Sequence, residues 1–451
     1  MAARSLGGTR MDHGTHTERP AIGVVGLGMT GLPLAGAFRD AGRRVLGFEA
    51  DPARRAAVEA GDGDALGVPA ERWFGPSGAQ RSDGRGSFDV ATDLERVAEC
   101  EALFLCLPTP LDADGAPDLS AIESAAHGLA PHLAPNALVV LCSTTWPGTT
   151  EQRLVPWLHE AGPRRLGRDL CVAYSPERED PGSGRRTREL PRLVGGMDAV
   201  SLERARAVLA EALDTVHPVE SCATAESAKL LENVFRAVNI ALVNEFKQVL
   251  DAQGIDVWPV VRAAATKPYG FMPFEPGPGL GGHCIPVDPE YLTWAARRAG
   301  VPATLVELAL DVNRDLPRRV VSKLSQALDL RGSQLEGARV LVLGAAYKPG
   351  VADTRESPGL RIMELCESAG ARTDYADPWV PRLDGDVPHA LSGRRSIDLA
   401  TADVADYDAV VLAVHHPGVD LAPVAASARL IVDTRDGFRG FDLPPERLVR
   451  A

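Results

Sequence analysis

The chain has 451 residues, of which 45% are hydrophobic and 24% charged, and its 48 basic and 61 acidic side chains leave a formal net charge of −13. This composition excludes a wholly disordered, collagen-like or coiled-coil protein. The length suffices for about three domains of roughly 150 residues each. Because the net charge is negative, the chain as a whole is not attracted to nucleic acid or to an anionic membrane, and we expect neither as a partner.

The cysteine content and the N-terminal residues bear on the compartment. Seven cysteines are too few for a disulfide scaffold in a chain of this size, and an odd number cannot all pair. No apolar run reaches the roughly 18 residues of a membrane span, and residues 1–20 lack the apolar core of a signal peptide. We therefore expect a cytoplasmic protein in which residues 1–20 form a disordered tail.

The first large segment has the rhythm of an α/β domain. From residue 21 the pattern reads as a strand, a glycine turn and a helix, followed by a strand at 45–48. Further β-rich runs, separated by stretches of helical spacing, follow at 103–106, 138–142 and 170–173. This pattern is typical of a mostly parallel sheet and predicts one domain over residues 21–218. We expect its glycine-rich segment, 61–86, to be a surface loop.

The middle of the chain is predicted to be helical. Residues 223–254 contain no proline and carry apolar side chains at 3.6-residue spacing, which predicts one long helix. A second helical segment is expected over roughly 289–328, after a glycine-rich loop. We interpret residues 219–330 as a central helical domain through which two copies of the chain pair, because a helix this long commonly packs against a partner copy.

The strand, turn and helix rhythm restarts at residue 338, which predicts a second α/β domain over residues 335–451. The predicted fold class is therefore α/β, with two doubly wound Rossmann-like domains joined by a central helical domain. Clefts between domains are favoured ligand sites, so we expect a substrate to bind between the two α/β domains.

The glycine turn near the N-terminus carries a nucleotide-binding pattern. Gly26, Gly28 and Gly31 form G-x-G-x-x-G between a predicted strand and a predicted helix. In this context glycines let the backbone approach a pyrophosphate at the helix N-terminus, whereas the alternative is a bare structural turn. Glu49 ends the next strand, where a carboxylate can accept hydrogen bonds from an adenosine ribose. Strand, helix and acidic residue agree, so we expect NAD, because Glu49 would repel the 2′-phosphate of NADP.

A second candidate site is the glycine- and proline-rich segment 276–288, which cannot be helical and delivers Cys284 into a loop. Asp288 is close enough in sequence to accompany a nucleophilic thiolate. The alternative, a small buried hydrophobe, is our interpretation of the cysteines Cys100, Cys106, Cys142, Cys171 and Cys366. The chain has no C-x-x-C pair, and the adjacent His283 and Cys284 cannot easily supply a tetrahedral metal site. His415 and His416 follow a strand without partners, so we expect no bound metal.

Polar residues three and four positions apart share one face of the long predicted helix, namely Glu226, Lys229, Asn233 and Arg236. Such a stripe is usually a solvated surface. Here the surrounding apolar residues cover so much of the helix that a fully solvated face is the weaker interpretation.

Seven blocks of the sequence, taken together and in their order along the chain, carry a resemblance to a known family. They are VGLGMTGLPLA (25–35), LPTPLD (107–112), STTWPGTT (143–150), YSPERED (174–180), ESAKLLENVFRAVNIALVNE (226–245), GPGLGGHCIPVDP (277–289) and GAAYKPGVADTRESP (344–358). In these blocks, from about residue 21 to 438, the chain resembles the UDP-glucose/GDP-mannose 6-dehydrogenase family. These nucleotide-sugar dehydrogenases oxidise a C6 alcohol to a carboxylate, use NAD and are typically dimeric through the central helix.

The resemblance implies roles for single residues. The catalytic set is Cys284 as nucleophile, Asp288 as its carboxylate, Lys229 and Asn233 as the pair that stabilises oxyanions and holds a water, Thr144 near the reacting carbon, and Glu177 of the S-P-E segment. The implied NAD contacts are Gly26, Gly28, Met29, Gly31, Glu49, Thr109, Pro110, Thr144 and Arg355. The implied nucleotide-sugar contacts are Glu177, Lys229, Asn233, Gly281 and Lys348. Phe271 and Phe274 either shape the sugar pocket or pack within their loop.

Two departures from the family pattern bear on the substrate. Glucose-specific members usually carry a lysine where this chain has Val287, and a second glutamate where it has Pro181. The blocks GGHCIPVDP and YSPEREDPG are more similar to the branch that acts on UDP-N-acetylhexosamines. The candidate substrates are therefore UDP-glucose, TDP-glucose and a UDP-N-acetylhexosamine.

The implied reaction is a four-electron oxidation to a uronic acid that consumes two NAD. The alcohol loses hydride while its proton leaves through Lys229, Asn233 and a water, and Cys284 then adds to the aldehyde. The thiohemiacetal loses a second hydride, and water hydrolyses the thioester. One alternative is a two-electron β-hydroxyacid dehydrogenase, which needs neither Cys284 nor a second α/β domain. Another is a non-catalytic protein that binds NAD or a sugar nucleotide.

Overall fold

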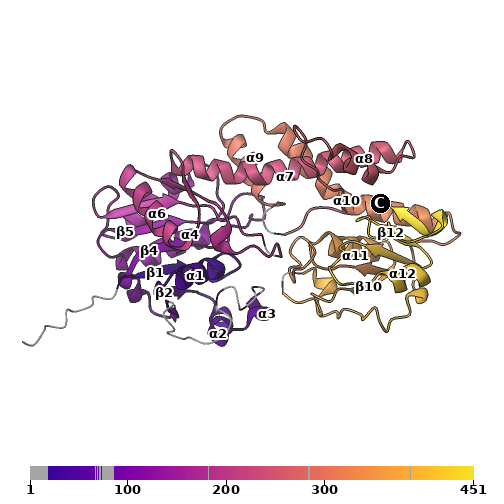
Figure 1. The fold of residues 1–451 in the computed structure, drawn as a ribbon, viewed down its shortest axis with the longest axis horizontal. Coiled ribbons are helices and arrows are strands. Elements are labelled where there is room, and N and C mark those ends of the chain that lie inside the picture. The colour runs from indigo at the N-terminus through magenta and orange to yellow at the C-terminus, as the bar shows by residue number, and fades with distance from the viewer. Residues whose placement is uncertain are drawn as a thin grey trace, which may run out of the picture.

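The structure, a computed structural model, describes residues 19–66, 68, 70, 73, 86–180, 182–282, 285–385 and 387–451. Figure 1 shows an N-terminal α/β lobe and a C-terminal α/β lobe side by side, with the long helix α7 running above them. Of the predicted tail, all but the last two residues lie outside the described ranges. Within those ranges, no helix is long and apolar enough to cross a membrane.

The N-terminal lobe contains an eight-stranded sheet in the order β3-β2-β1-β4-β5-β6-β7-β8. In sheet order these strands are Phe88–Ala91, Val45–Phe48, Ala21–Val25, Cys100–Leu105, Ala137–Leu141, Leu170–Tyr174, Arg192–Gly196 and Val216–Pro218. Neighbours are parallel except for β6 and β7, which are antiparallel. The strand order reverses between β1 and β4, and open α/β sheets bind ligands at the carboxyl ends of strands at such a point.

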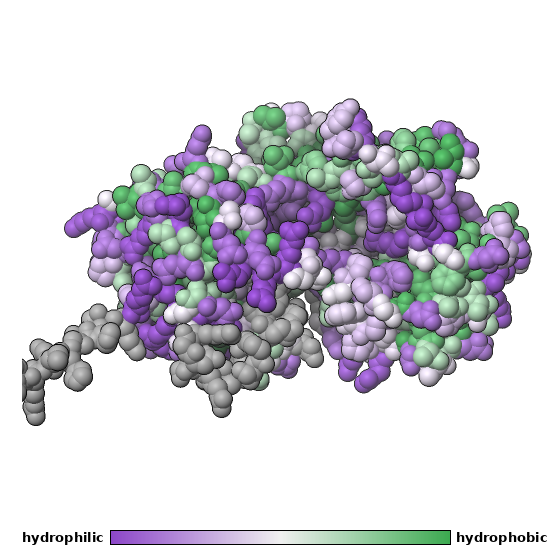
Figure 2. Space-filling model, viewed as in Figure 1, coloured by the Kyte–Doolittle hydropathy of each residue, from purple (hydrophilic) through white to green (hydrophobic). Residues whose placement is uncertain are grey.

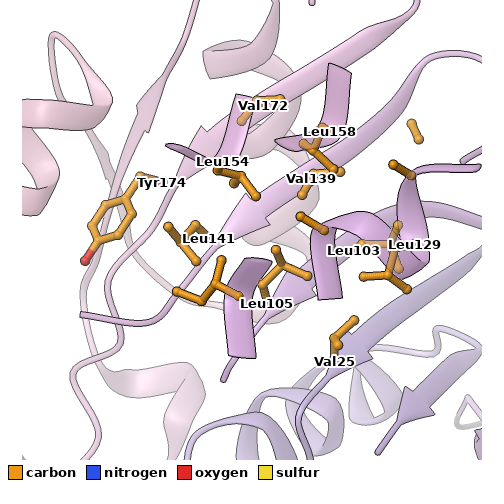
Figure 3. Close-up of a cluster of buried hydrophobic side chains, with 14 of the residues drawn as sticks. Val25, Leu103, Leu105, Leu129, Val139, Leu141, Leu154, Leu158, Val172 and Tyr174 are labelled. Carbon is orange, nitrogen blue, oxygen red and sulfur yellow. The ribbon is translucent and has the colours of Figure 1, made fainter. Parts of the chain in front are cut away.

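Helices cover both faces of this sheet, which explains why its central strands are mostly apolar. Alternate residues of β4 enter two separate clusters, with Leu103 and Leu105 on one side and Phe104 on the other. Figure 3 shows the first cluster, in which Leu105 and Leu141 lie beneath Leu154. The helices are α1 (Gly31–Asp40), α2 (Pro52–Ala60), α3 (Gly63–Leu66), α4 (Ser120–Leu129), α5 (Val155–Ala161) and α6 (Ala199–Ala212), with shorter helical turns at Leu94–Glu99, Ala130–His132, Thr150–Leu154 and Thr187–Glu189.

The prediction that residues 61–86 form a surface loop is wrong for helix α3, at Gly63–Leu66, and for three buried side chains of this segment. Leu66, Val68 and Trp73 are buried in the second cluster, and Trp73 Nε1 donates to the Val68 carbonyl at 3.3 Å. Removing the surface of three apolar side chains from water stabilises this arrangement. Most of residues 74–86 lie outside the described ranges.

The central part of the chain is helical, as predicted, and contains α7 (Cys222–Asp251), α8 (Val257–Ala264), α9 (Asp288–Arg298) and α10 (Thr304–Asp329). Helix α7 has 30 residues, and the Ser221 side chain caps it by accepting from the Thr224 N–H at 3.1 Å. The expected second helix is two helices, α9 and α10. They are separated by Gly300, whose φ of +70° is left-handed, and by Pro302, and both residues disfavour a continuous helix.

The C-terminal lobe contains a five-stranded, fully parallel sheet in the order β10-β9-β11-β12-β13. In sheet order the strands are Arg372–Ala376, Arg339–Leu343, Ala409–Leu412, Ile431–Asp433 and Leu448–Arg450. Its helices are α11 (Pro358–Ser368) and α12 (Ala422–Ser427), with shorter turns at His389–Leu391, Val404–Asp406 and Pro445–Arg447. Together with the first sheet and the helices between them, this lobe confirms the predicted α/β fold class.

Candidate active site

The glycine loop after β1 has the shape that a dinucleotide requires. Gly26 has a left-handed φ of +88°, and a Cβ there would lie 2.4 Å from the Cys106 carbonyl oxygen. A Cβ at Gly31 would lie 1.9 Å from the Gly26 carbonyl oxygen. These two glycines are required by the fold itself. A Cβ at Gly28, by contrast, would have no described atom within 4 Å. The backbone is thus bare at the start of α1, where a pyrophosphate fits.

Glu49 follows β2 and lies against the glycine loop. Its Oε2 accepts from the Leu27 N–H at 2.9 Å, and its Oε1 accepts from the Asp51 N–H at 3.1 Å. The side chain is half-buried, and each oxygen has a further lone pair for a ribose hydroxyl. The geometry therefore suits the predicted role of Glu49 in binding the adenosine ribose.

The carboxyl ends of β4 and β5 bring three further predicted residues to the same edge of the sheet. The Thr109 hydroxyl donates to the Thr144 carbonyl at 3.0 Å, and the Tyr291 hydroxyl of α9 donates to the Thr109 carbonyl at 2.8 Å. Pro110, next to Thr109, is exposed. These contacts attach the loop after β4, whose Thr109 and Pro110 are predicted to contact the cofactor, to the central helices.

Four of the six predicted catalytic residues form one buried cluster. Lys229 Nζ donates to the Glu177 carbonyl at 2.9 Å and to Glu177 Oε1 at 3.2 Å. The Asn233 amide donates to Asp288 Oδ2. All four residues are at most 9% exposed, although they come from α7, from the start of α9 and from the loop after β6. Cys284 lies outside the described residues.

The cluster perturbs the ionisation of both carboxyl groups. Burial raises the pKa of Asp288 to about 7, although the Lys229 charge and hydrogen bonds from Asn233 and Thr144 act in the opposite direction. Burial alone would also raise the pKa of Glu177, but the Lys229 ammonium and the Glu179 N–H outweigh it and hold that pKa below its ordinary value. The cluster therefore combines a charged Lys229–Glu177 pair with a carboxyl group that can exchange a proton near neutral pH.

The four polar residues predicted to share one face of α7 differ in burial. Glu226, Lys229 and Asn233 are buried, as the apolar surroundings indicated, whereas Arg236 is exposed. Glu226 does not contact the catalytic cluster through its carboxylate. Its Oε1 accepts from the Thr150 N–H at 2.9 Å and from the Thr150 hydroxyl at 2.6 Å, and its Oε2 accepts from the Gly148 N–H. Glu226 thus holds the loop after β5.

The C-terminal lobe reaches the N-terminal lobe through the loop at residues 344–356. Lys348 Nζ pairs with Asp180 Oδ1 at 2.6 Å, and Arg355 Nη2 lies 3.2 Å from Met29 Sδ. The structure therefore brings Met29 and Arg355, both predicted NAD contacts, together between the lobes. Lys348 pairs with the segment that follows Glu177 rather than with the catalytic cluster.

The loop that precedes Cys284 packs against this interlobe loop. The Gly282 N–H donates to the Arg355 carbonyl at 2.9 Å, and a Cβ at Gly281 would lie 2.5 Å from Tyr347 Cβ. Gly281 is thus needed for the close approach of the two loops. The Phe274 ring packs on Phe235 with centroids 5.7 Å apart, whereas Phe271 is 43% exposed. Phe274 therefore packs against helix α7, and the roles of Phe271 and Phe274 in a sugar pocket stay predictions.

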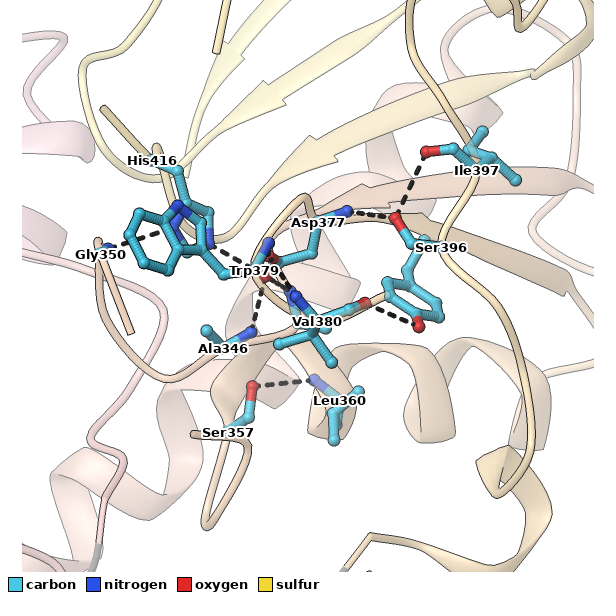
Figure 4. Close-up of polar contacts among 12 residues, drawn as sticks. Ala346, Gly350, Ser357, Leu360, Asp377, Trp379, Val380, Ser396, Ile397 and His416 are labelled. Carbon is cyan, nitrogen blue, oxygen red and sulfur yellow. Dashed lines mark hydrogen bonds and ion pairs between the residues drawn. The ribbon is translucent and has the colours of Figure 1, made fainter. Parts of the chain in front are cut away.

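A buried pair in the C-terminal lobe corrects the expectation that His416 lacks a partner. His416 Nε2 donates to Asp377 Oδ2 at 2.9 Å, and its Nδ1 accepts from the Gly350 N–H at 3.1 Å (Figure 4). The same Asp377 oxygen accepts from the N–H groups of Ala345 and Ala346 at 2.8 and 2.9 Å. This network fixes both ends of the turn that carries Lys348. The partners are 39 residues apart, so local sequence does not reveal them.

Arg435 is a candidate binding residue that the sequence reasoning missed. It follows β12, its Nε donates to the Ala413 carbonyl at 2.9 Å, and a Cβ at Gly277 would lie 2.6 Å from its Nη1. Burial lowers the pKa of Arg435 to about 10, against the charges of Glu275 and Asp433. A guanidinium beside a glycine loop suits a phosphate ligand. The available signal was an arginine three residues after the apolar run 430–432.

Comparisons with known proteins agree with this arrangement. The UDP-glucose/GDP-mannose dehydrogenase family matches the chain in three parts, its NAD binding domain over residues 20–213, its central domain over 223–315 and its UDP binding domain over 341–439. The chain belongs to this family. It is an NAD-dependent dehydrogenase that acts on a CH–OH group, as the resemblance implied.

The relatives of this dehydrogenase match it over most of both chains. The UDP-N-acetyl-D-glucosamine 6-dehydrogenase of Pseudomonas aeruginosa is 32% identical over 88% of this chain and 90% of its own. The UDP-N-acetyl-D-mannosamine dehydrogenase of Salmonella typhi is 33% identical over 93% and 99%. The UDP-D-ManNAc dehydrogenase structure from Pyrococcus horikoshii has a TM-score of 0.79 at 29% identity, covering 92% of this chain and 95% of that chain. The predicted similarity to the UDP-N-acetylhexosamine branch is confirmed.

Proposed function

We propose that this dehydrogenase oxidises the C6 alcohol of a UDP-N-acetylhexosamine to the uronic acid, in four electrons and with two NAD. The observation that carries the proposal is the buried cluster of Lys229, Glu177, Asn233 and Asp288 at the end of the N-terminal sheet. The names of the relatives in Pseudomonas aeruginosa and Salmonella typhi support the N-acetylhexosamine class over UDP-glucose or TDP-glucose.

The cofactor would lie along the carboxyl ends of β1, β2 and β4. Gly28 and the start of α1 suit its pyrophosphate, Glu49 suits the adenosine ribose, and Arg355 of the C-terminal lobe closes the site against Met29 of the glycine loop. Thr109, Pro110 and Thr144 border the opposite side of this crevice. NAD supplies the hydride acceptor for both oxidations.

In the first oxidation, Lys229 and Asn233 hold the C6 oxygen as its negative charge develops, and its proton leaves through a water held by the pair. The Lys229 charge is maintained by Glu177, which contacts it at 3.2 Å. Thr144 lies beside Asp288 and is well placed to orient the reacting carbon. The product of this step is an aldehyde at C6.

In the second oxidation, the Cys284 thiol adds to the aldehyde carbon, and the thiol proton passes to Asp288. A carboxyl group whose pKa is about 7 is suited to accept and return a proton at neutral pH. Asp288 returns this proton to the former aldehyde oxygen, which completes the thiohemiacetal. Loss of hydride from the thiohemiacetal carbon, and of its hydroxyl proton to the water held by Lys229 and Asn233, gives a thioester. Water then attacks the thioester carbon, which releases the carboxylate and restores the thiol.

We assign the nucleotide part of the substrate to the C-terminal lobe, proposed to span residues 335–451. Lys348 and Arg435 supply positive charge for a diphosphate, and Gly281 packs against Tyr347, the residue before Lys348. Residues 21–218 would then be the NAD domain and residues 219–330 the central domain. A cytoplasmic location is part of this proposal and is supported by the sparse cysteines.

The central domain is also the proposed homodimer interface. One face of α7 exposes five large apolar side chains, which are Leu231, Phe235, Leu242, Phe246 and Val249. Their spacings of four, seven, four and three residues place them in one stripe, opposite the buried face that carries Lys229 and Asn233. Figure 2 shows hydrophobic surface gathered over the helices at the top of the molecule. A continuous apolar stripe of this length is typical of a surface that another protein covers, here a second copy.

The test is the number of NADH molecules formed per limiting nucleotide sugar, with UDP-N-acetylglucosamine, UDP-N-acetylmannosamine, UDP-glucose and TDP-glucose. We expect two NADH with one of the N-acetylhexosamines. Cys284→Ser should abolish acid formation, while Cys171→Ala, at another free thiol, should retain it. One NADH per sugar in the wild type, or full turnover of Cys284→Ser, would contradict the four-electron mechanism.

A further inference from the structure

Two free cysteines follow the neighbouring strands β4 and β5, and the mechanism above uses neither of them. The last paired residues of these parallel strands are Leu105 and Leu141, both labelled in Figure 3. The next residue of each strand is Cys106 and Cys142, and the Cys142 N–H still donates to the Leu105 carbonyl at 2.9 Å. Cys142 belongs to the second apolar cluster, and Cys106 packs against it. The two side chains therefore share one face of the sheet, directly across from each other.

The spacing of this pair suits a disulfide bond. Neighbouring strands lie about 4.8 Å apart, and the Cα atoms of a disulfide are usually about 4.4–6.8 Å apart. The side chains also contact each other, because the Cys106 thiol and the Cys142 sulfur share a hydrogen bond. Cys171 of β6 is different, since it lies opposite Leu138, four residues and about 13 Å along the strands from Cys142.

The surroundings of the pair favour an ionised, reactive thiol. Burial raises the pKa of Cys142, but the hydrogen bond with Cys106 and the charge of Arg192 outweigh it, so this pKa lies below its ordinary value. Arg192 is 3% exposed, and its Nε has no hydrogen-bond partner among the described residues. Cys142 is fully buried, whereas Cys106 is only half-buried and is open to a small oxidant. The pair thus joins an accessible thiol to a nucleophilic one.

Cys106 also touches the glycine loop of the proposed NAD site. Its N–H donates to the Val25 carbonyl at 2.8 Å, and its carbonyl oxygen would lie 2.4 Å from a Cβ at Gly26. This contact lies between β1 and β4, where the strand order of the sheet reverses. A displacement of Cys106 would therefore displace the backbone that is expected to hold the pyrophosphate.

The loops that begin at the two cysteines are joined to each other as well. The Ser143 hydroxyl accepts from the Leu107 N–H at 3.0 Å and donates to the Leu107 carbonyl at 2.7 Å. Further along, the Thr109 hydroxyl donates to the Thr144 carbonyl at 3.0 Å. Thr109 and Thr144 are both predicted NAD contacts, so a change at the base of these loops reaches the cofactor from a second side.

We propose that Cys106 and Cys142 form a modification site, at which a peroxide reversibly generates a disulfide that weakens NAD binding. One peroxide oxygen adds to the Cys106 sulfur, which gives a sulfenic acid and one water. The Cys142 sulfur then displaces hydroxide from the sulfenic sulfur, and the S–S bond forms. The hydroxide takes up the proton that the Cys142 thiol lost and becomes the second water. The two thiols together lose two electrons, which the peroxide gains, and an external dithiol restores both thiols by exchange.

The size of the required movement sets the expected effect. The Cβ atoms of a disulfide are about 3.8 Å apart, whereas side chains across two strands start from about 4.8 Å. The ends of β4 and β5 must therefore approach or rotate by about 1 Å. Misplacement by that amount is costly at a site that must hold its ligand precisely, so we expect the Kd for NAD to rise about tenfold or more.

The test measures NAD binding by calorimetry before and after treatment with hydrogen peroxide. It uses the Cys284→Ser background, because Cys284 is itself a proposed reactive thiol. We expect the Kd to rise after peroxide and to return with dithiothreitol, and peptide mass spectrometry should find Cys106 linked to Cys142. Absence of this link, or a link with an unchanged Kd, would overturn the proposal. Because the readout is cofactor binding, it is independent of which nucleotide sugar the enzyme oxidises.

Substitutions in the same background separate this pair from the other thiols. Cys106→Ala and Cys142→Ala each remove one partner, so both should keep their affinity for NAD after peroxide. Cys171→Ala is the matched control, because it removes a thiol from the same apolar cluster but outside the pair, and it should lose affinity like the parent. An equal loss in Cys106→Ala and Cys171→Ala would assign the effect to another group and would overturn the inference.

Discussion

The Asn233 side chain of α7 donates to the Asp288 carboxylate at the first residue of α9. Both side chains are buried, at 5% and 3% exposure, so two helices of the central part meet around an acid that water does not solvate. This contact couples the conformation of the Cys284 loop, which ends at Asp288, to the long helix that carries Lys229.

The first prediction concerns the pH dependence of stability. Asp288 has a pKa of about 7 in the folded protein against 3.8 ordinarily, so between about pH 4 and pH 7 only the folded state holds this proton. Stability from this group is therefore present at low pH and is lost as pH rises through 7. At about 1.4 kcal/mol per pKa unit the loss is at most about 4 kcal/mol.

Asp288→Asn removes this titration while keeping a similar shape. The difference in melting temperature between the variant and the wild type, measured from pH 4 to 8, should change in favour of the variant as pH rises. All other groups titrate in both proteins and cancel. Parallel curves would show that Asp288 does not carry a raised pKa.

The second prediction separates cofactor binding from folding at the glycine loop. Gly28→Ala adds a Cβ where no described atom lies within 4 Å, so the fold should tolerate it, but this Cβ would occupy the approach of a pyrophosphate. We expect KM for NAD to rise about tenfold or more, which is roughly 1.4 kcal/mol, with an unchanged melting temperature. Gly440→Ala is the matched control, because it also adds a Cβ in open space and lies in the C-terminal lobe. Equal NAD affinity in both variants would exclude the pyrophosphate from Gly28.

The third prediction concerns the carboxylate that holds the loop after β5. Glu226→Ala leaves three donors of Gly148 and Thr150 without an acceptor, which should destabilise the protein by about 2–5 kcal/mol. Burial already raises the pKa of Glu226, so Glu226→Gln should cost less. Glu232→Ala, which breaks only a surface pair with Arg178, should cost at most about 1 kcal/mol. Urea unfolding compares the three, and equal losses would contradict the anchoring role of Glu226.

The parts of the candidate site that lie within a single strand, loop or helix could be predicted from the sequence. The glycine pattern between strand and helix identified the loop at Gly26, and the apolar surroundings of Lys229 and Asn233 indicated a buried face. Composition misled the interpretation of 61–86, where glycines concealed the burial of Trp73.

The remainder depends on contacts between distant segments. Glu226 and Arg236 belong to the same series of three- and four-residue spacings, yet only Glu226 meets a loop 76 residues earlier in the chain. Likewise, Asp377 and His416 are partners because they follow β10 and β11, the two strands that flank β9 in the parallel sheet. Spacing within one helix or strand carries no information on which segment will cover it.

The last prediction concerns the apolar stripe of α7. Leu242 is 62% exposed at the middle of the stripe, and Leu242→Glu would place a charge among Phe235, Phe246 and its copies across the proposed interface. Burying an unpaired charge is expensive, so the variant should be a monomer at concentrations where the wild type is a dimer. Light scattering after size-exclusion chromatography measures the mass of each.

The control for this experiment is Leu330→Glu. Leu330 is 90% exposed just beyond α10 and lies outside the α7 stripe, so the same change of residue type should leave the dimer intact. Both leucines are already exposed to water in the single chain. A difference between the two variants would therefore come from the position of the new charge and not from the charge itself. A wild-type monomer, or dissociation by both variants, would contradict pairing through the stripe, whereas dissociation by Leu242→Glu alone would place the two-fold axis on α7.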